Sequence, residues 1–100
     1  MKLLVLPGDG IGPEITAATI AVLDAASEKF HLGISLETRE VGLAALRTHG
    51  TTLPDGILER ARSVDGVILG PLDQLRYPPA DQGGVNPSAL FRVKLDLYAN

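Results

Sequence analysis

The sequence has no cysteine, which excludes disulfides, thiolate metal sites and thiol catalysis together. Its two histidines, His31 and His49, lie too far apart for metal-ligand spacing. No apolar run approaches the roughly 18 residues that a membrane-spanning helix requires, and the segment 3–6 is too short for a signal-peptide core. Nine basic and twelve acidic residues give a net charge of −3, with no block of like charge longer than two. This pattern argues against a nucleic-acid surface or a polybasic membrane patch, and we expect a cytoplasmic globular domain.

What is present fits one folded unit. The 100 residues are 45% hydrophobic and 21% charged, a composition that excludes intrinsic disorder. The length is typical of a single domain. Asn100 falls inside an apolar stretch with no stop signal before it, so we expect the chain to be part of a longer protein.

Strand and helix signals alternate along the chain. Short apolar runs predict strands at 2–6, 34–41 and 64–69. Helical spacing, with helix starts at Pro13 and at Asn86-Pro87, predicts helices over 13–30, 43–48, 53–62 and 86–96. This order predicts an α/β fold with a parallel sheet and right-handed crossovers.

The spacing of apolar residues also predicts which helix faces meet the core. In the first helix, one stripe at three- and four-residue spacing is expected to face the sheet: Ile15, Ala18, Val22, Ala26 and Phe30. In the last helix, the expected core face carries Ala89, Leu90 and Val93, with Phe91 and Leu95 flanking it.

Three features are candidates for ligand contact. The turn Gly8–Pro13 follows a strand and opens a helix, but it matches neither a G-x-G-x-x-G fingerprint nor a Walker loop. It is therefore either a ligand contact or a tight turn that needs glycine. The loop 72–85 leaves the carboxyl end of a predicted strand, where open α/β sheets place ligands, although it could be an ordinary surface loop.

The third candidate is Arg92. On an ideal helix it lies within about 40° of Ser88, and its guanidinium could hold a carboxylate through two hydrogen bonds. The alternative is a surface ion pair with Asp96. His31 and His49 are expected to be solvated helix-end residues, and Arg60 and Arg62 a solvated helix face.

These features occur together in an order that resembles one family. LPGDGIGPEI at 6–15, VILGPL at 67–72 and FRVKLDLYAN at 91–100 are similar to segments of the metal-dependent β-decarboxylating dehydrogenases. This family contains 3-isopropylmalate, isocitrate, homoisocitrate and tartrate dehydrogenases. The resemblance covers the whole chain and is closest to 3-isopropylmalate dehydrogenase. It implies that residues 1–100 are the N-terminal part of a larger α/β domain, with a three-layer, doubly wound, mostly parallel sheet.

The resemblance also implies an activity and a set of site residues. Family members oxidise a 2-hydroxy acid with NAD or NADP, and Mg²⁺ or Mn²⁺ stabilises the enolate formed as CO₂ leaves. They form homodimers. Arg92 matches a substrate-carboxylate arginine, and Ser88 falls where a residue touches the substrate's variable group. The positions that match the cofactor side are Ile11, Leu72, Asp73, Gln74, Gly83, Gly84 and Val85. The catalytic Tyr and Lys and the metal-binding aspartates match nothing within 1–100, so this segment alone is expected to be inactive.

The substrate and the class of protein stay open on sequence alone. Isopropylmalate enzymes usually carry an apolar triplet before the arginine helix, whereas this chain has Asn86-Pro87-Ser88. The loop length favours the isopropylmalate branch, but these residues do not. Two other classes are a non-catalytic α/β binding module and a small flavodoxin-like nucleotide-binding domain. The mass of the purified protein, and direct binding of FMN or a nucleotide, would discriminate them.

Overall fold

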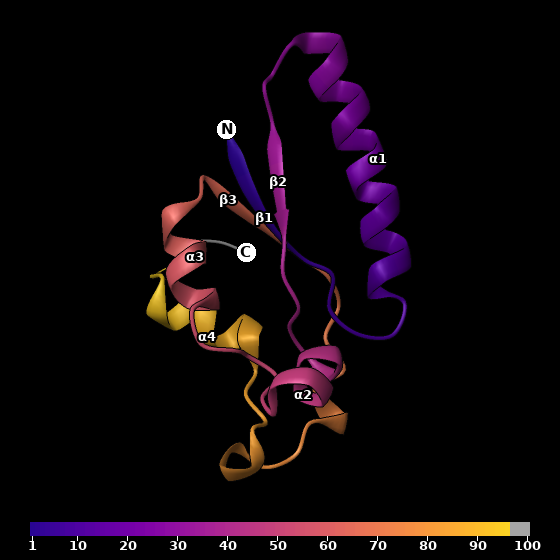
Figure 1. The fold of residues 1–100 in the computed structure, drawn as a ribbon. Helices are drawn as coiled ribbons and strands as arrows, with labels where there is room; N and C mark the ends of the chain where they lie inside the picture. The colour runs from indigo at the N-terminus through magenta and orange to yellow at the C-terminus, as the bar shows by residue number, and fades with distance from the viewer. Residues whose placement is uncertain (97–100) are drawn as a thin grey trace.

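The computed structural model describes residues 1–96, so the predicted apolar stretch 97–100 lies outside the described residues. Strands and helices alternate as predicted (Figure 1). The strands are β1 (Lys2–Leu6), β2 (Ser35–Thr38) and β3 (Gly66–Leu69), and the helices are α1 (Gly12–Phe30), α2 (Leu43–His49), α3 (Ile57–Ser63) and α4 (Pro87–Lys94). None of the helices in this part of the chain is long and apolar enough to cross a membrane.

The three strands form one parallel sheet in the order β2-β1-β3. In the middle strand, Leu4 lies opposite Glu37 on one side and opposite Val67 on the other. The three last residues of β1 are completely buried, which fits a central strand covered on both faces. The sequence prediction of an α/β fold with a parallel sheet is confirmed.

Helices cover both faces of the sheet (Figure 1). Successive side chains of a strand point to opposite faces, and Leu4 and Leu6 belong to one cluster with Ile57 of α3 and Phe91 of α4. The long helix α1 lies on the other side of the strands. The described residues thus form three layers, with the main apolar core between the sheet and the pair α3 and α4.

The outer strands β2 and β3 are shorter than predicted, and β3 covers Gly66–Leu69 instead of 64–69. Pro7 has no backbone N–H, so it ends the ladder of β1, and β2 ends with it because Val5 pairs with Thr38. The strand predicted over 34–41 is therefore only Ser35–Thr38. β2 lies at one edge of the sheet, which agrees with its more polar sequence.

The predicted core face of α1 is wrong. The stripe residues Ile15, Val22 and Phe30 are 45%, 70% and 62% exposed. Of the predicted stripe only Ala26 is half-buried. The other half-buried positions follow Thr16, which is buried, on the neighbouring face of the helix: Ile20, Leu23 and Ser27. Five alanines between positions 17 and 26 make apolar character available at many angles, so the periodicity could not select the face that packs.

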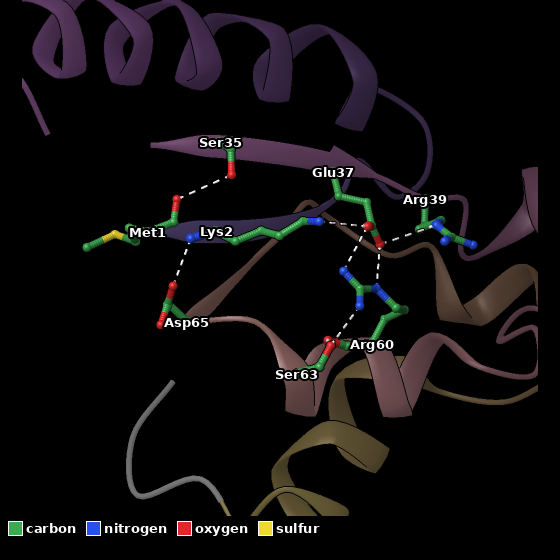
Figure 2. Close-up of polar contacts among 8 residues, drawn as sticks. All are labelled: Met1, Lys2, Ser35, Glu37, Arg39, Arg60, Ser63 and Asp65. Atoms are coloured by element: carbon green, nitrogen blue, oxygen red, sulfur yellow. Dashed lines mark hydrogen bonds and ion pairs between the residues drawn. The ribbon is translucent and has the colours of Figure 1, made fainter. Parts of the chain in front are cut away.

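Arg60 belongs to an ion pair between two elements and is not simply a solvated helix residue, as the sequence suggested. Its Nε and Nη2 atoms donate to the two carboxylate oxygens of Glu37, each at 2.8 Å, and so connect α3 to β2 (Figure 2). Lys2 and Arg39 approach the same carboxylate at 3.5 and 3.4 Å. The hydrogen bond from Arg60, followed by the charges around it, lowers the pKa of Glu37 from 4.5 to about 2.

Candidate functional site

A cavity of about 530 Å³ lies between the carboxyl end of β3 and α4. Val67 and Leu69 of β3, together with Phe91, form its apolar part. Its polar lining comes from Gln74, Asn86, Ser88 and Arg92. Open α/β sheets bind ligands at the carboxyl ends of their strands, so both the location and the mixed lining are typical of a small-molecule site.

The start of α4 decides which side chains reach this cavity. The Asn86 side chain accepts a hydrogen bond from the Ala89 N–H at 3.2 Å, and Pro87 occupies the first turn. Both were predicted as helix-start signals, and the N-cap is confirmed. From this start, Ser88 and Arg92 follow one turn apart, and both line the cavity.

The core face predicted for α4 is wrong in part, because Ala89 and Leu90 are half-buried but the third predicted residue, Val93, faces outward. Phe91 is 4% exposed and belongs to the core cluster, while Val93 is 77% exposed. Phe91 and Pro87 are four residues apart and are the two buried residues of the helix, so they share the inward face. The helix is short and has apolar residues at several angles around its axis, so the apolar pattern did not determine which face packs inward.

Arg92 lines the cavity without a protein partner among residues 1–96. No ion pair within this range includes it, and the alternative pair with Asp96 is not formed. The neighbouring Arg62, by contrast, is bound by Glu59 and by the Lys94 carbonyl oxygen. The five donors of the Arg92 guanidinium are therefore available to an anionic ligand in the cavity.

The turn after β3, which lines the cavity through Gly70 and Pro71, packs closely against the turn after β1. A Cβ atom at Gly70 would overlap the Pro7 carbonyl oxygen, and one at Gly8 would overlap the Pro71 carbonyl oxygen. The backbone of the turn after β1 therefore lies directly against the backbone after β3. Only glycine permits this approach, and Gly8 also has a φ of +82°. The turn Gly8–Pro13 is thus a tight turn that needs glycine, which was one of the two interpretations of its sequence.

Asp9 is a residue that the sequence reasoning missed. It is 6% exposed, and its carboxylate accepts three hydrogen bonds. The donors are the Leu43 N–H at 2.7 Å, the Asp73 N–H at 2.9 Å and the Tyr77 hydroxyl at 2.5 Å. An acidic residue between two glycines in an otherwise apolar turn was the available signal. Its partners are 34 to 68 positions away, so no local pattern could identify them.

Thr52 is the second missed residue, and it holds the far end of the loop 72–85. Its side chain is completely buried. The hydroxyl accepts a hydrogen bond from the Val85 N–H at 2.7 Å and donates to the Val85 carbonyl oxygen at 2.6 Å. The Thr52 N–H also donates to the Gly83 carbonyl oxygen at 2.9 Å.

The structure divides the predicted site residues into two groups. Four of them line the cavity: Leu72, Gln74, Ser88 and Arg92. The other five do not line it: Ile11, Asp73, Gly83, Gly84 and Val85. Ile11 is 63% exposed in the turn before α1, and the three residues 83–85 lie beside the segment 50–52 and Pro78. An amide hydrogen bond from Asn86 to Gln74 connects the loop to α4 at the cavity.

His31 and His49 are exposed at the ends of α1 and α2, as predicted. Within residues 1–96, no group of three or more His, Asp or Glu side chains is arranged to hold a metal ion. The described part of the chain does not therefore offer a donor set that fits Mg²⁺ or Mn²⁺, which prefer several oxygen ligands.

Fold and cavity together define a class of protein, an α/β domain with a ligand cavity at the carboxyl edge of a parallel sheet. The sequence profile of the isocitrate/isopropylmalate dehydrogenase family matches residues 2–100. The chain belongs to this family. It is 51% identical over 99% of its length to a 3-isopropylmalate dehydrogenase of Pseudomonas fluorescens.

Solved structures agree with this assignment. The isocitrate dehydrogenase of Methylococcus capsulatus aligns with a TM-score of 0.78 at 34% identity, over 98% of this chain and 26% of that one. A β-decarboxylating dehydrogenase of Thermococcus kodakarensis aligns with a TM-score of 0.78 at 29% identity, over 97% of this chain and 27% of that one. The chain spans 28% of the length of the curated relatives it matches.

Proposed function

We propose that the full-length protein oxidises and decarboxylates a 3-substituted malate, as a 3-isopropylmalate dehydrogenase does. The observation that carries this proposal is the position of Arg92. Its guanidinium lines the cavity without a protein partner among residues 1–96, one helical turn from Ser88. Family membership supports a β-decarboxylating dehydrogenase. Isocitrate, homoisocitrate and tartrate are the alternative substrates.

In this proposal Arg92 binds and orients a substrate carboxylate through paired hydrogen bonds, and Ser88 contacts the 3-substituent. Leu72 and Gln74 border the same cavity, on the side proposed for the cofactor. The remaining positions proposed for that side are Ile11, Asp73, Gly83, Gly84 and Val85. When bound, NAD, or alternatively NADP, accepts a hydride from the substrate carbon that carries the hydroxyl.

The other parts of the proposed activity come from outside the described residues. We propose that side chains beyond this segment hold the Mg²⁺ or Mn²⁺ ion and supply the acid and base groups. We further propose that the full-length protein is a cytoplasmic homodimer with no nucleic-acid or membrane partner. Residues 1–100 alone are then expected to reduce no dinucleotide.

A specific observation favours a small or polar 3-substituent. Besides Ser88, the neighbouring Asn86 at the start of α4 gives the cavity lining a second polar side chain on the side proposed for the 3-substituent. A site that hydrogen-bonds a substrate group discriminates against analogues that lack it better than an apolar pocket does. We therefore expect malate or tartrate to be accepted at least as well as isopropylmalate.

The test is a turnover panel with the full-length protein. Isopropylmalate, isocitrate, tartrate and malate are each offered with NAD and with NADP, in the presence of Mg²⁺ or Mn²⁺, and dinucleotide reduction is followed by absorbance. A reaction without protein is the control for non-enzymatic reduction, and chelation of the metal tests metal dependence. Turnover of at least one hydroxy acid supports the proposal, and a protein inactive on the whole panel would overturn it. The same assay on residues 1–100 tests the expected inactivity of the segment.

A further inference from the structure

The carboxylate of Asp9 connects three segments that are distant in sequence. Asp9 itself lies in the turn between β1 and α1. One of its oxygens accepts the N–H of Leu43, the first residue of α2, and the other accepts the Asp73 N–H and the Tyr77 hydroxyl. The backbone of Asp9 adds a contact, because its N–H donates to the Pro71 carbonyl oxygen at 2.7 Å. The start of the loop 72–85 is thus bonded to this one residue from several sides.

A carboxylate suits this position for a chemical reason. It presents two acceptor oxygens and no donor, and all three partners are donors. No ion pair among residues 1–96 includes Asp9, so hydrogen bonds are what compensate for its burial here. The packing is close, since a Cβ atom at Gly42 would overlap the carboxylate. An asparagine of the same shape would turn a donor toward a donor.

The Asp73 N–H that is bonded to Asp9 lies between two residues that line the cavity. Asp73 does not line the cavity, but its neighbours Leu72 and Gln74 both do. Fixing the Asp73 N–H therefore fixes the stretch of backbone that carries two cavity-lining side chains. Only the backbone N–H of Asp73 is used, and the side chain pairs with Arg76 on the surface.

The other end of the loop 72–85 is also hydrogen-bonded, through Thr52, to the segment at the start of α2. Thr52 bonds Gly83 and Val85, and its carbonyl oxygen accepts the Gly42 N–H at 2.7 Å. Gly42 immediately precedes Leu43, the residue that donates to Asp9. Both ends of the loop are consequently connected to the start of α2, one through Asp9 at Leu43 and the other through Thr52 at Gly42, the residue before the helix.

We propose that Asp9 is a positioning residue for the cofactor side of the cavity, holding the loop at Asp73 and Tyr77 so that Leu72 and Gln74 are in place before a ligand binds. The expected effect on turnover rests on the proposed function. The attachment of the loop to Asp9 through these hydrogen bonds does not depend on it. Preorganisation of this kind removes the entropic cost of ordering a loop at the moment of binding.

Tyr77 stays a donor over the whole physiological pH range. Burial, the hydrogen bond to Asp9 and the nearby carboxylates of Asp9 and Asp73 all raise the pKa of Tyr77 above its ordinary value. The phenol thus keeps the proton that it shares with Asp9.

The attachment is tested by hydrogen–deuterium exchange on the full-length protein without ligand. In Asp9→Asn, amides of the segment 73–77 are expected to exchange roughly tenfold faster, because losing a buried hydrogen bond favours local opening by about that factor. Tyr77→Phe removes one of the bonds and is expected to give a smaller acceleration of about threefold. Asp24→Asn, an exposed position on α1, changes the charge equally and is the matched control.

The positioning role is tested by steady-state kinetics on the same proteins with NAD and the best hydroxy acid of the panel. The KM for NAD is expected to rise about tenfold in Asp9→Asn, while the KM for the hydroxy acid, bound through α4, changes less than twofold. Equal rises in both KM values would indicate a general structural role and overturn the proposal, as would unchanged exchange at 73–77. If Asp9→Asn does not fold, the exchange and KM values of Tyr77→Phe decide the question alone.

The two proposals fail in different ways. A wild-type protein that turns over no substrate of the panel contradicts the proposed function, and the exchange experiment still tests the attachment. A wild-type protein with full turnover whose NAD KM is unchanged in Asp9→Asn contradicts the positioning role alone.

Discussion

Replacing Thr52 with valine should destabilise the protein by an amount that the structure allows us to work out. The Thr52 side chain is completely buried. Its hydroxyl is bonded to both backbone polar groups of Val85, at 2.7 and 2.6 Å. Valine keeps the shape of the side chain and removes the hydroxyl, so the N–H and the carbonyl oxygen of Val85 both lose this partner.

Each buried backbone group left without a hydrogen bond costs about 1–3 kcal/mol. Two such groups would cost roughly 2–6 kcal/mol if neither met water. Val85 is half-buried, so water can reach part of its backbone, and we expect the lower end of the range, about 2 kcal/mol. A loss of this size lowers the folding equilibrium constant on the order of 30-fold.

The assay is equilibrium urea unfolding of the full-length protein, with Thr52→Ser as the matched control. Serine retains the hydroxyl and loses one methyl group, which costs about 1 kcal/mol. The two variants therefore separate the hydrogen bonds from packing. Hydrogen–deuterium exchange should locate the extra opening of Thr52→Val at residues 83–85. If Thr52→Val were as stable as wild type, or if the serine variant were the less stable of the two, the hydrogen bonds would not be what holds the loop.

Three further predictions concern turnover and pH. Arg92→Lys keeps the charge but loses the planar pair of donors, so kcat/KM should fall roughly tenfold to a hundredfold with little change in the thermal midpoint of unfolding. The exposed Arg47→Lys is the control. An unchanged kcat/KM in Arg92→Lys would exclude carboxylate binding by Arg92. Ser88→Leu should shift the kcat/KM ratio of isopropylmalate to malate toward isopropylmalate by roughly 1–3 kcal/mol, and an unchanged ratio would mean that Ser88 does not face the substituent. The pKa of Glu37 is lowered to about 2 in the folded state. The contribution of Glu37 to stability is therefore present above about pH 4.5 and is lost as the pH falls through about 2. The free energy of unfolding of Glu37→Gln should vary less than that of wild type between these pH values, as unfolding measured at a series of acid pH values would show.

Local signals in the sequence were sufficient for the order of the elements and for several helix starts. Pro13 and the pair Asn86-Pro87 mark helices where the structure has them, because capping and a fixed proline φ act within a few residues. The first residues of α3 were predicted too early, near Pro54. Gly56 has a φ of +91°, a left-handed conformation that ends any helix reaching back from Ile57.

The faces of the helices could not be predicted with the same success. Periodicity reports that a helix is amphipathic only when polar residues fill the remaining angles. The alanines of α1 weaken that contrast, and its exposed residues Ile15 and Val22 form an apolar stripe as regular as the one that packs. In α4, Phe91 turned inward and Val93 outward, a choice that depends on the shape of the core between α3 and the sheet.

The candidate site was predictable where it depends on one element and not where it depends on several. Ser88 and Arg92 line the cavity together, as expected of residues one turn apart on one helix. Asp9 and Thr52 hold the loop through contacts between residues 31 to 68 positions apart. Such pairs are determined by the packing of distant segments, and a single sequence contains no local pattern for them.

The failed phosphate-loop match at the first turn now has a physical explanation. A phosphate loop needs free backbone N–H groups and room for an anion. Here the Asp9 N–H is bonded to the Pro71 carbonyl oxygen and the Gly12 N–H to the Asp9 carbonyl oxygen, and the Asp9 carboxylate places negative charge in the same turn. Two of the backbone donors of the turn are thus already bonded, and a pyrophosphate would also meet a like charge. The turn therefore uses its carboxylate and two of its backbone N–H groups to hold itself and the neighbouring loop in place, and the side chain of Ile11 is 63% exposed beside it.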